Sequence, residues 1–110
     1  MFLHYIRISV ATAATPRPSD PRDPRPSAHE SLFDLETGEF LRQTTHQGFR
    51  GDSCWSRGLA WAIYGFGTAY AYARDPLLLA TAEACADFYI CHTPDDGVPP
   101  WDYDAPAGSP

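Results

Sequence analysis

The 110-residue chain contains no lysine, and its eight basic residues are all arginines, against fourteen acidic residues. The formal net charge of −6 and the pI near 4.9 follow from this imbalance. Nucleic-acid binding depends on clustered lysine or arginine that neutralises phosphates, so the composition argues against a nucleic-acid partner. An anionic ligand would have to be held locally, by single arginines.

Paired cysteines and long apolar runs are lacking too. Cys54, Cys85 and Cys91 are odd in number and lack the close spacing of zinc ribbons or redox loops, so we expect reduced, buried thiols and no metal or other cofactor. No apolar run approaches the roughly 20 residues of a membrane span, which argues against a membrane partner. Because Arg7 interrupts the apolar start, a signal peptide is only faintly suggested, and we expect a cytoplasmic protein, with secretion the alternative.

Prolines dominate the first part of the chain. Over residues 15–28 they alternate with arginine and aspartate, at Pro16, Pro18, Pro21, Pro24 and Pro26. Proline removes a backbone donor and is excluded from helix interiors and central strands. We therefore predict a disordered arm over residues 1–28 and a folded part over residues 29–110.

Two hairpins are expected in the folded part. Short strand-like runs flank a turn at Thr37-Gly38, which predicts a β-hairpin or a wide loop. Residues 53–73 are apolar nearly all the way round, which predicts a buried helix capped by Asp52 or Ser53. The Asp75-Pro76 pair starts a second helix that ends near residue 91. The two helices would form an αα-hairpin, which makes the fold all-α.

Arg57 and Trp61 are the most informative pair for function. They are four residues apart and share one face of the first helix. A guanidinium suits a carboxylate or paired hydroxyls, while an indole offers a flat apolar surface to the C–H face of a pyranose. The pair indicates an acidic sugar ligand. The alternatives are that Arg57 fixes a loop through Asp52 and that Trp61 is core.

Four features carry a family resemblance: the segment THQGFRGDSCWSRGLAWAIYGF (45–66), the Asp75-Pro76 helix start, DGVPPWDYDAP (96–106) and FDLETGEFLRQ (33–43). From about His29 to Pro106 the chain resembles, in order and spacing, the unsaturated glucuronyl hydrolases of glycoside hydrolase family 88. The resemblance implies an incomplete (α/α)6 barrel of the six-hairpin glycosidase type. It also implies hydration of the enol-ether double bond of Δ4,5-unsaturated uronic acids on lyase-generated oligosaccharides.

The same resemblance implies which residues contact the sugar. Its substrate-binding positions match His29, Thr45, Gln47, Arg57 and Trp61. The partner would be a small acidic oligosaccharide. Gln47 could instead be an amide that stabilises its loop.

A catalytic acid is the missing part. The family's catalytic aspartates precede the position of His29, where this chain has its arginine-proline segment, so we assign no catalytic residue and expect an inactive fragment. We interpret Asp52 as a helix cap rather than an acid, and the Asp95-Asp96 and Asp102-Asp104 pairs as solvated turn carboxylates rather than calcium ligands. The alternative function is a non-catalytic helical interaction fragment, and apolar helix faces would favour self-association.

Overall fold

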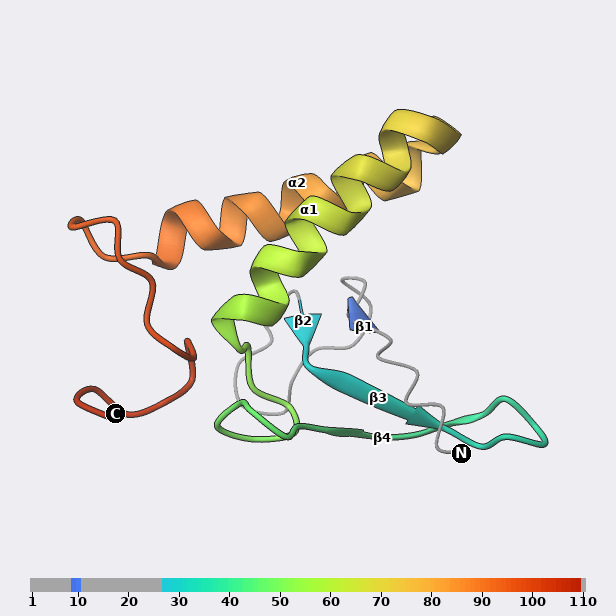
Figure 1. The fold of residues 1–110 in the computed structure, drawn as a ribbon, viewed down its shortest axis with the longest axis horizontal. Coiled ribbons are helices and arrows are strands. Elements are labelled where there is room, and N and C mark those ends of the chain that lie inside the picture. The colour runs from blue at the N-terminus through green and yellow to red at the C-terminus, as the bar shows by residue number, and fades with distance from the viewer. Residues whose placement is uncertain (1–8, 11–26, 110) are drawn as a thin grey trace.

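Two α-helices and four short strands make up the part of the chain that a computed structural model describes, residues 9–10 and 27–109. In chain order they are β1 (Ser9–Val10), β2 (Ser27–Ala28), β3 (Glu30–Phe33), β4 (Phe40–Thr44), α1 (Ser56–Ala73) and α2 (Pro76–His92). Figure 1 shows the two helices packed together, with β2 below the first turns of α1. The all-α class with one αα-hairpin and a short β-hairpin is confirmed.

A link of two residues joins the helices into the αα-hairpin. Arg74 ends α1 in the left-handed conformation (φ 56°), and its N–H donates to the Tyr70 carbonyl at 2.9 Å. The Asp75 carboxylate then accepts a hydrogen bond from the Leu77 N–H at 2.9 Å, while Pro76 takes the first helical position, where no N–H is needed. The predicted aspartate-proline start of α2 is confirmed.

The start of α1 differs from the prediction. The helix begins at Ser56, with Trp55 as an N-cap residue whose side chain makes no capping bond. Asp52 does not cap the helix, because its carboxylate accepts a hydrogen bond from Arg50 Nε at 2.9 Å. The Ser56 N–H donates to the Trp101 carbonyl at 3.2 Å instead. A segment far along the chain thus satisfies a free amide at this helix end.

One face of α1 is buried, rather than its whole circumference. Gly58, Leu59 and Ala62 are buried, whereas Trp61 and Tyr64 are 60% and 65% exposed. The predicted enclosed helix is therefore wrong for this chain, because α2 covers one side of α1 and the other side stays open. Within the described ranges, both helices fall short of the length and apolarity that crossing a bilayer requires.

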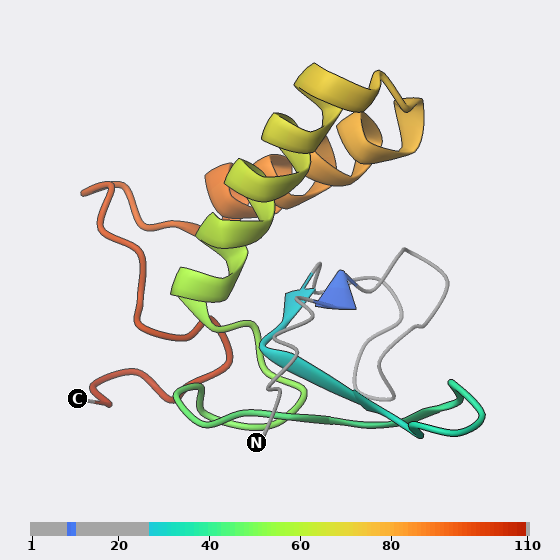
Figure 2. The same ribbon diagram turned by 45° about the vertical axis from the view of Figure 1, so that its right-hand side comes forward.

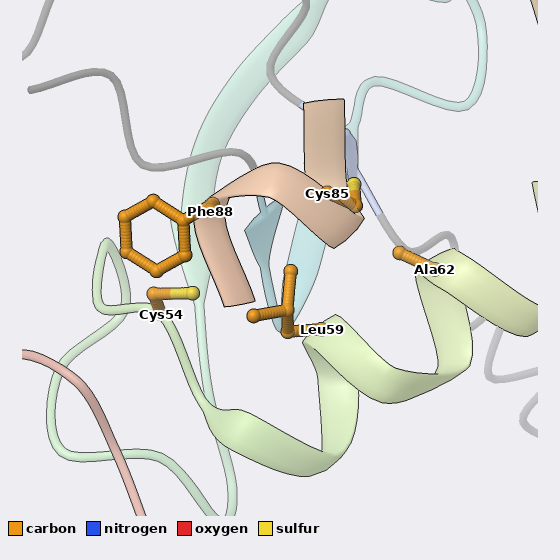
Figure 3. Packing of buried hydrophobic residues seen from close by; sticks show 5 residues of the cluster. All are labelled: Cys54, Leu59, Ala62, Cys85 and Phe88. Carbon is orange, nitrogen blue, oxygen red and sulfur yellow. The ribbon is translucent and has the colours of Figure 1, made fainter. Parts of the chain in front are cut away.

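The hydrophobic core lies between the two helices and the residues just before α1. Its buried members are Cys54, Leu59, Ala62, Cys85 and Phe88 (Figure 3). Ile63, Phe66, Tyr89 and Tyr103 pack around them. Burying one large apolar side chain stabilises a fold by about 1.5–3 kcal/mol, so this small cluster holds the hairpin together. Cys54 and Cys85 are buried, but Cys91 is exposed, which corrects the expectation that all three thiols are buried.

A β-hairpin of β3 and β4 extends away from the helices, as Figure 2 shows. The Asp34 carboxylate shapes its turn by accepting hydrogen bonds from the Thr37 N–H at 2.8 Å and the Glu36 N–H at 2.9 Å. These bonds, that from Thr37 first, lower the pKa of Asp34. Gly38 follows with φ 74°, a conformation that favours glycine. The predicted β-hairpin is confirmed.

β2 lies inside the stretch predicted to be a disordered arm, residues 1–28. Ser9–Val10 and Ser27–Ala28 pair as antiparallel strands, and Ser27 and Ala28 are each 2% exposed. Ordered structure therefore already includes Ser27 rather than starting at His29. Residues 1–8 and 11–26 lie outside the described residues, so the rest of the predicted arm stays a prediction.

Candidate functional site

Residues 45–53 form a loop between β4 and the start of α1, and the Thr45 hydroxyl organises it. Thr45 Oγ1 accepts hydrogen bonds from the Gly48 N–H at 2.7 Å and the Gln47 N–H at 3.3 Å. A Cβ at position 48 would lie 2.8 Å from Thr45 Oγ1, so the close approach requires glycine there. The loop thereby holds the Gln47 backbone while its side chain stays exposed.

His29, between β2 and β3, is joined to this loop. Its ring is 9% exposed, and its Nδ1 lies 2.8 Å from Thr45 Oγ1. Either the Thr45 hydroxyl or the ring N–H can be the donor in this contact, because the roles depend on the tautomer of the ring. This contact ties His29 to the loop that carries Gln47.

Arg57 meets the loop from the first turn of α1. Its Nη2 donates to Gln47 Oε1 at 3.4 Å, and its Cζ lies 4.7 Å from the ring centroid of Trp55. Among the described residues no carboxylate forms an ion pair with Arg57, and Asp52, its alternative partner, pairs with Arg50. The guanidinium is therefore free to meet an anion.

A shallow, open depression lies beside Arg57 on the exposed face of α1. It has a volume of about 440 Å³ and is lined by Arg57, Ala60, Trp61 and Tyr64. The Trp61 and Tyr64 rings meet edge to face, with centroids 6.1 Å apart. Trp61 therefore faces a concavity and is not the core residue that the alternative interpretation suggested.

Asp102 anchors the loop from a distant part of the sequence. Its side chain is 1% exposed, and its Oδ2 accepts hydrogen bonds from the Ser53 hydroxyl at 2.6 Å and the Phe49 N–H at 2.9 Å. Asp104 accepts a hydrogen bond from the Cys54 N–H at 2.7 Å. Asp102 is thus a buried structural carboxylate rather than a solvated one, and Ser53 serves this anchor rather than capping α1.

No group of His, Cys, Asp or Glu side chains in the described ranges is arranged to hold a metal ion. None of the residues that line the depression is acidic. The arrangement can therefore recognise an anion beside an aromatic surface, and these residues contribute no acid to the depression.

The five predicted sugar-binding residues are linked by contacts. His29 and Thr45 share a hydrogen bond, and the loop of Thr45 carries Gln47. Gln47 in turn contacts Arg57, and Arg57 lines the depression together with Trp61. Their role in binding stays a prediction.

Sequence reasoning missed two aromatic residues of the site. Tyr64 follows Arg57 by seven residues and Trp61 by three, so helical spacing places it on the same face, but spacing alone does not show that it lines the depression. The contacts of Trp55 with Arg57 and His29 come from a tertiary arrangement that no local spacing reveals.

Comparisons with known proteins give related sequences, although no family model matches the chain. It is 46% identical over 80 residues to the unsaturated glucuronyl hydrolase of Formosa agariphila, and the aligned residues make up 71% of this chain and 20% of the relative. It is 39% identical over 102 residues to the unsaturated glucuronyl hydrolase of Bacillus sp. strain GL1, which covers 93% of this chain and 27% of that relative. The chain thus spans about a fifth to a quarter of the length of these relatives.

The fold agrees with the sequence comparison. The crystal structure of the Bacillus sp. GL1 enzyme matches 73% of this chain and 21% of that one, with a TM-score of 0.70 and 42% identity. The αα-hairpin therefore corresponds to part of the α/α barrel of these proteins. By this shared sequence and fold, the chain belongs to the unsaturated glucuronyl hydrolase family.

Proposed function

We propose that the site binds the terminal unsaturated uronyl residue of an acidic oligosaccharide, and that the chain supplies this recognition to a glycoside hydrolase of the unsaturated glucuronyl hydrolase type. The observation that carries the proposal is the Arg57 guanidinium, which lies beside an aromatic depression without a carboxylate partner among the described residues. Although the chain carries a net charge of −6, a cation in this position attracts an anion locally.

The chemistry of each side chain fits a uronic acid. The Arg57 fork can donate two parallel hydrogen bonds to the sugar carboxylate, a geometry that lysine cannot offer. The exposed indole of Trp61 supplies an apolar surface for the ring. The Gln47 amide, already in contact with Arg57, would take part in holding hydroxyl groups.

Relatives narrow the substrate class. The solved Bacillus sp. GL1 enzyme is described as responsible for the degradation of glycosaminoglycan. A solved unsaturated glucuronyl hydrolase from Streptococcus agalactiae, 35% identical with a TM-score of 0.57, is complexed with dGlcA-GalNAc6S. For this chain we extend the proposal to oligosaccharides of this glycosaminoglycan type.

Hydration of the enol ether needs an acid that delivers a proton to the double bond. In the described ranges no Asp or Glu lines the depression, and Asp52 is an exposed partner of Arg50. We therefore expect the chain alone to bind the sugar without turnover, measured as constant absorbance of the conjugated double bond. Turnover that Asp52→Asn abolishes would contradict this expectation.

Binding of dGlcA-GalNAc6S, measured by isothermal titration calorimetry, tests the proposal. Arg57→Gln should weaken binding by about 10- to 100-fold, because it removes charged hydrogen bonds to the carboxylate. Arg74→Gln is the matched control: it removes the same charge at the far end of α1, about 25 Å away. Equal affinities of Arg57→Gln and the unaltered chain, or equal affinity for a neutral disaccharide, would refute the proposed role of Arg57.

A further inference from the structure

We propose that Trp55 is a positioning residue, whose buried indole holds both the Arg57 guanidinium and the His29 ring where the sugar is bound. This inference rests on the proposed function, because it assigns the residue that shapes that same site. Trp55 is 8% exposed and does not line the depression among the residues described, so it acts through its neighbours rather than by touching the ligand.

The indole contacts one predicted sugar-binding residue from each side of the site. The Arg57 Cζ lies 4.7 Å from the Trp55 ring centroid. The His29 ring centroid lies 4.3 Å from it, with the planes inclined by 39°. His29 comes from the strands and Arg57 from α1, so Trp55 joins the two parts of the site.

Arg57 needs this support because its other described contact is weak. The hydrogen bond to Gln47 Oε1 is 3.4 Å long, near the limit at which such a bond contributes. An unsupported arginine side chain loses rotamer entropy when a ligand fixes it. Attraction between the guanidinium and the indole face offsets part of that loss before the ligand arrives.

Trp55 is itself held firmly by the fold. Its backbone has φ −70° and ψ 126° at the N-cap of α1, and it forms an isolated antiparallel bridge with Asp102. Gly58, one turn further along, leaves room for the indole, since a Cβ there would lie 3.3 Å from Trp55 Cε3. The ring is thus a fixed surface against which the Arg57 guanidinium and the His29 ring rest.

Two substitutions of Trp55 distinguish a contribution of its aromatic face from a contribution of its volume alone. Trp55→Leu removes the face and should weaken dGlcA-GalNAc6S binding by about tenfold, whereas Trp55→Phe should restore most of the affinity. Trp101→Leu is the matched control, with the same atoms removed outside the site, and should bind normally. In the Arg57→Gln background, Trp55→Leu should weaken binding much less than in the unaltered chain, because it acts through Arg57.

Proton NMR of the free chain gives a readout that needs no ligand. Side-chain protons of Arg57 and ring protons of His29 lie against an indole and should be shielded, and Trp55→Leu should remove this shielding while Trp55→Phe retains part of it. If the unaltered chain does not bind the disaccharide but shows the shielding, the proposed function fails and the positioning contact stands. Absence of the shielding in the unaltered chain, or equal weakening of binding by both substitutions, would overturn the inference.

Discussion

Burial raises the pKa of the Cys85 thiol from its ordinary 9.0 to about 11, because the helix pair keeps water from the thiolate. Burial also raises the pKa of Tyr103, because its effect outweighs that of the hydrogen bond with Thr93, which lowers this pKa. Both groups favour the neutral form in the folded chain. Their protonation therefore contributes stability that high pH removes.

The pH dependence of unfolding tests this environment. Below pH 9.0 both states keep the Cys85 thiol protonated, so its contribution is complete; between 9.0 and about 11 the unfolded chain ionises first. We expect the free energy of unfolding to fall as the pH rises through this window. Urea titrations should show a smaller fall for Cys85→Ala, with the remainder due in part to Tyr103. A stability that rises across the window would contradict the predicted burial of the thiol.

At the scale of the element, the two helices begin by different means. α2 starts with a cap and a proline that are adjacent in the sequence, Asp75 and Pro76. At the start of α1, the Ser56 N–H instead donates a hydrogen bond to the carbonyl of Trp101, which is distant in the sequence. The start of α2 could therefore be predicted from the sequence, whereas the start of α1 could not, because local cap signals at residues 52–53 are used elsewhere.

Removing the cap of α2 should have a measurable cost. Asp75→Ala loses the bond to the Leu77 N–H and should reduce the free energy of unfolding by about 0.5–2 kcal/mol. Glu83→Ala, which removes a carboxylate from an exposed position inside the same helix, is the control and should change stability little. Chemical unfolding monitored by circular dichroism measures both. Equal losses in the two variants would show that charge, not capping, matters.

At the scale of the whole molecule, the C-terminal segment is fastened to the start of α1. The Tyr103 N–H donates to the Cys54 carbonyl at 3.0 Å. The buried Asp102 carboxylate accepts hydrogen bonds from the Phe49 N–H and the Ser53 hydroxyl. The sequence Asp-Tyr-Asp looks like a polar turn, so its burial could not be predicted without the tertiary arrangement. The Arg57–Trp61 pair could be predicted, since helix spacing alone puts both on one face.

Asp102→Asn should loosen the loop. The amide either turns its NH₂ group toward the Phe49 N–H and the Ser53 hydroxyl, which are themselves donors, or leaves one of these donors without an acceptor. Each buried group left unsatisfied costs about 1–3 kcal/mol of stability. We expect lower stability and faster hydrogen exchange at the Phe49 amide. Asp95→Asn, at an exposed position, is the control. Unchanged exchange at Phe49 would show that the carboxylate is not the anchor.

Apolar side chains on open helix faces predict self-association. Large exposed residues on the helices are Trp61, Tyr64 and Tyr72 on α1 and Leu77 and Ile90 on α2. Contact between such faces removes apolar surface from water. Sedimentation velocity should show a weight-average mass that increases with concentration. A monomer at every concentration, with a sharp thermal transition, would contradict this prediction.

The long reach of the Asp102 anchor has a consequence for synthesis. Its bonds to Phe49 and Ser53 span 53 and 49 residues. On the ribosome, the loop with Thr45 and Gln47 emerges well before the carboxylate that secures it, and closing so long a segment carries an entropic cost. The proposed sugar-binding loop is therefore secured late in synthesis. A translation product stopped before residue 102 would lack this anchor even though it already carries Arg57 and Trp61.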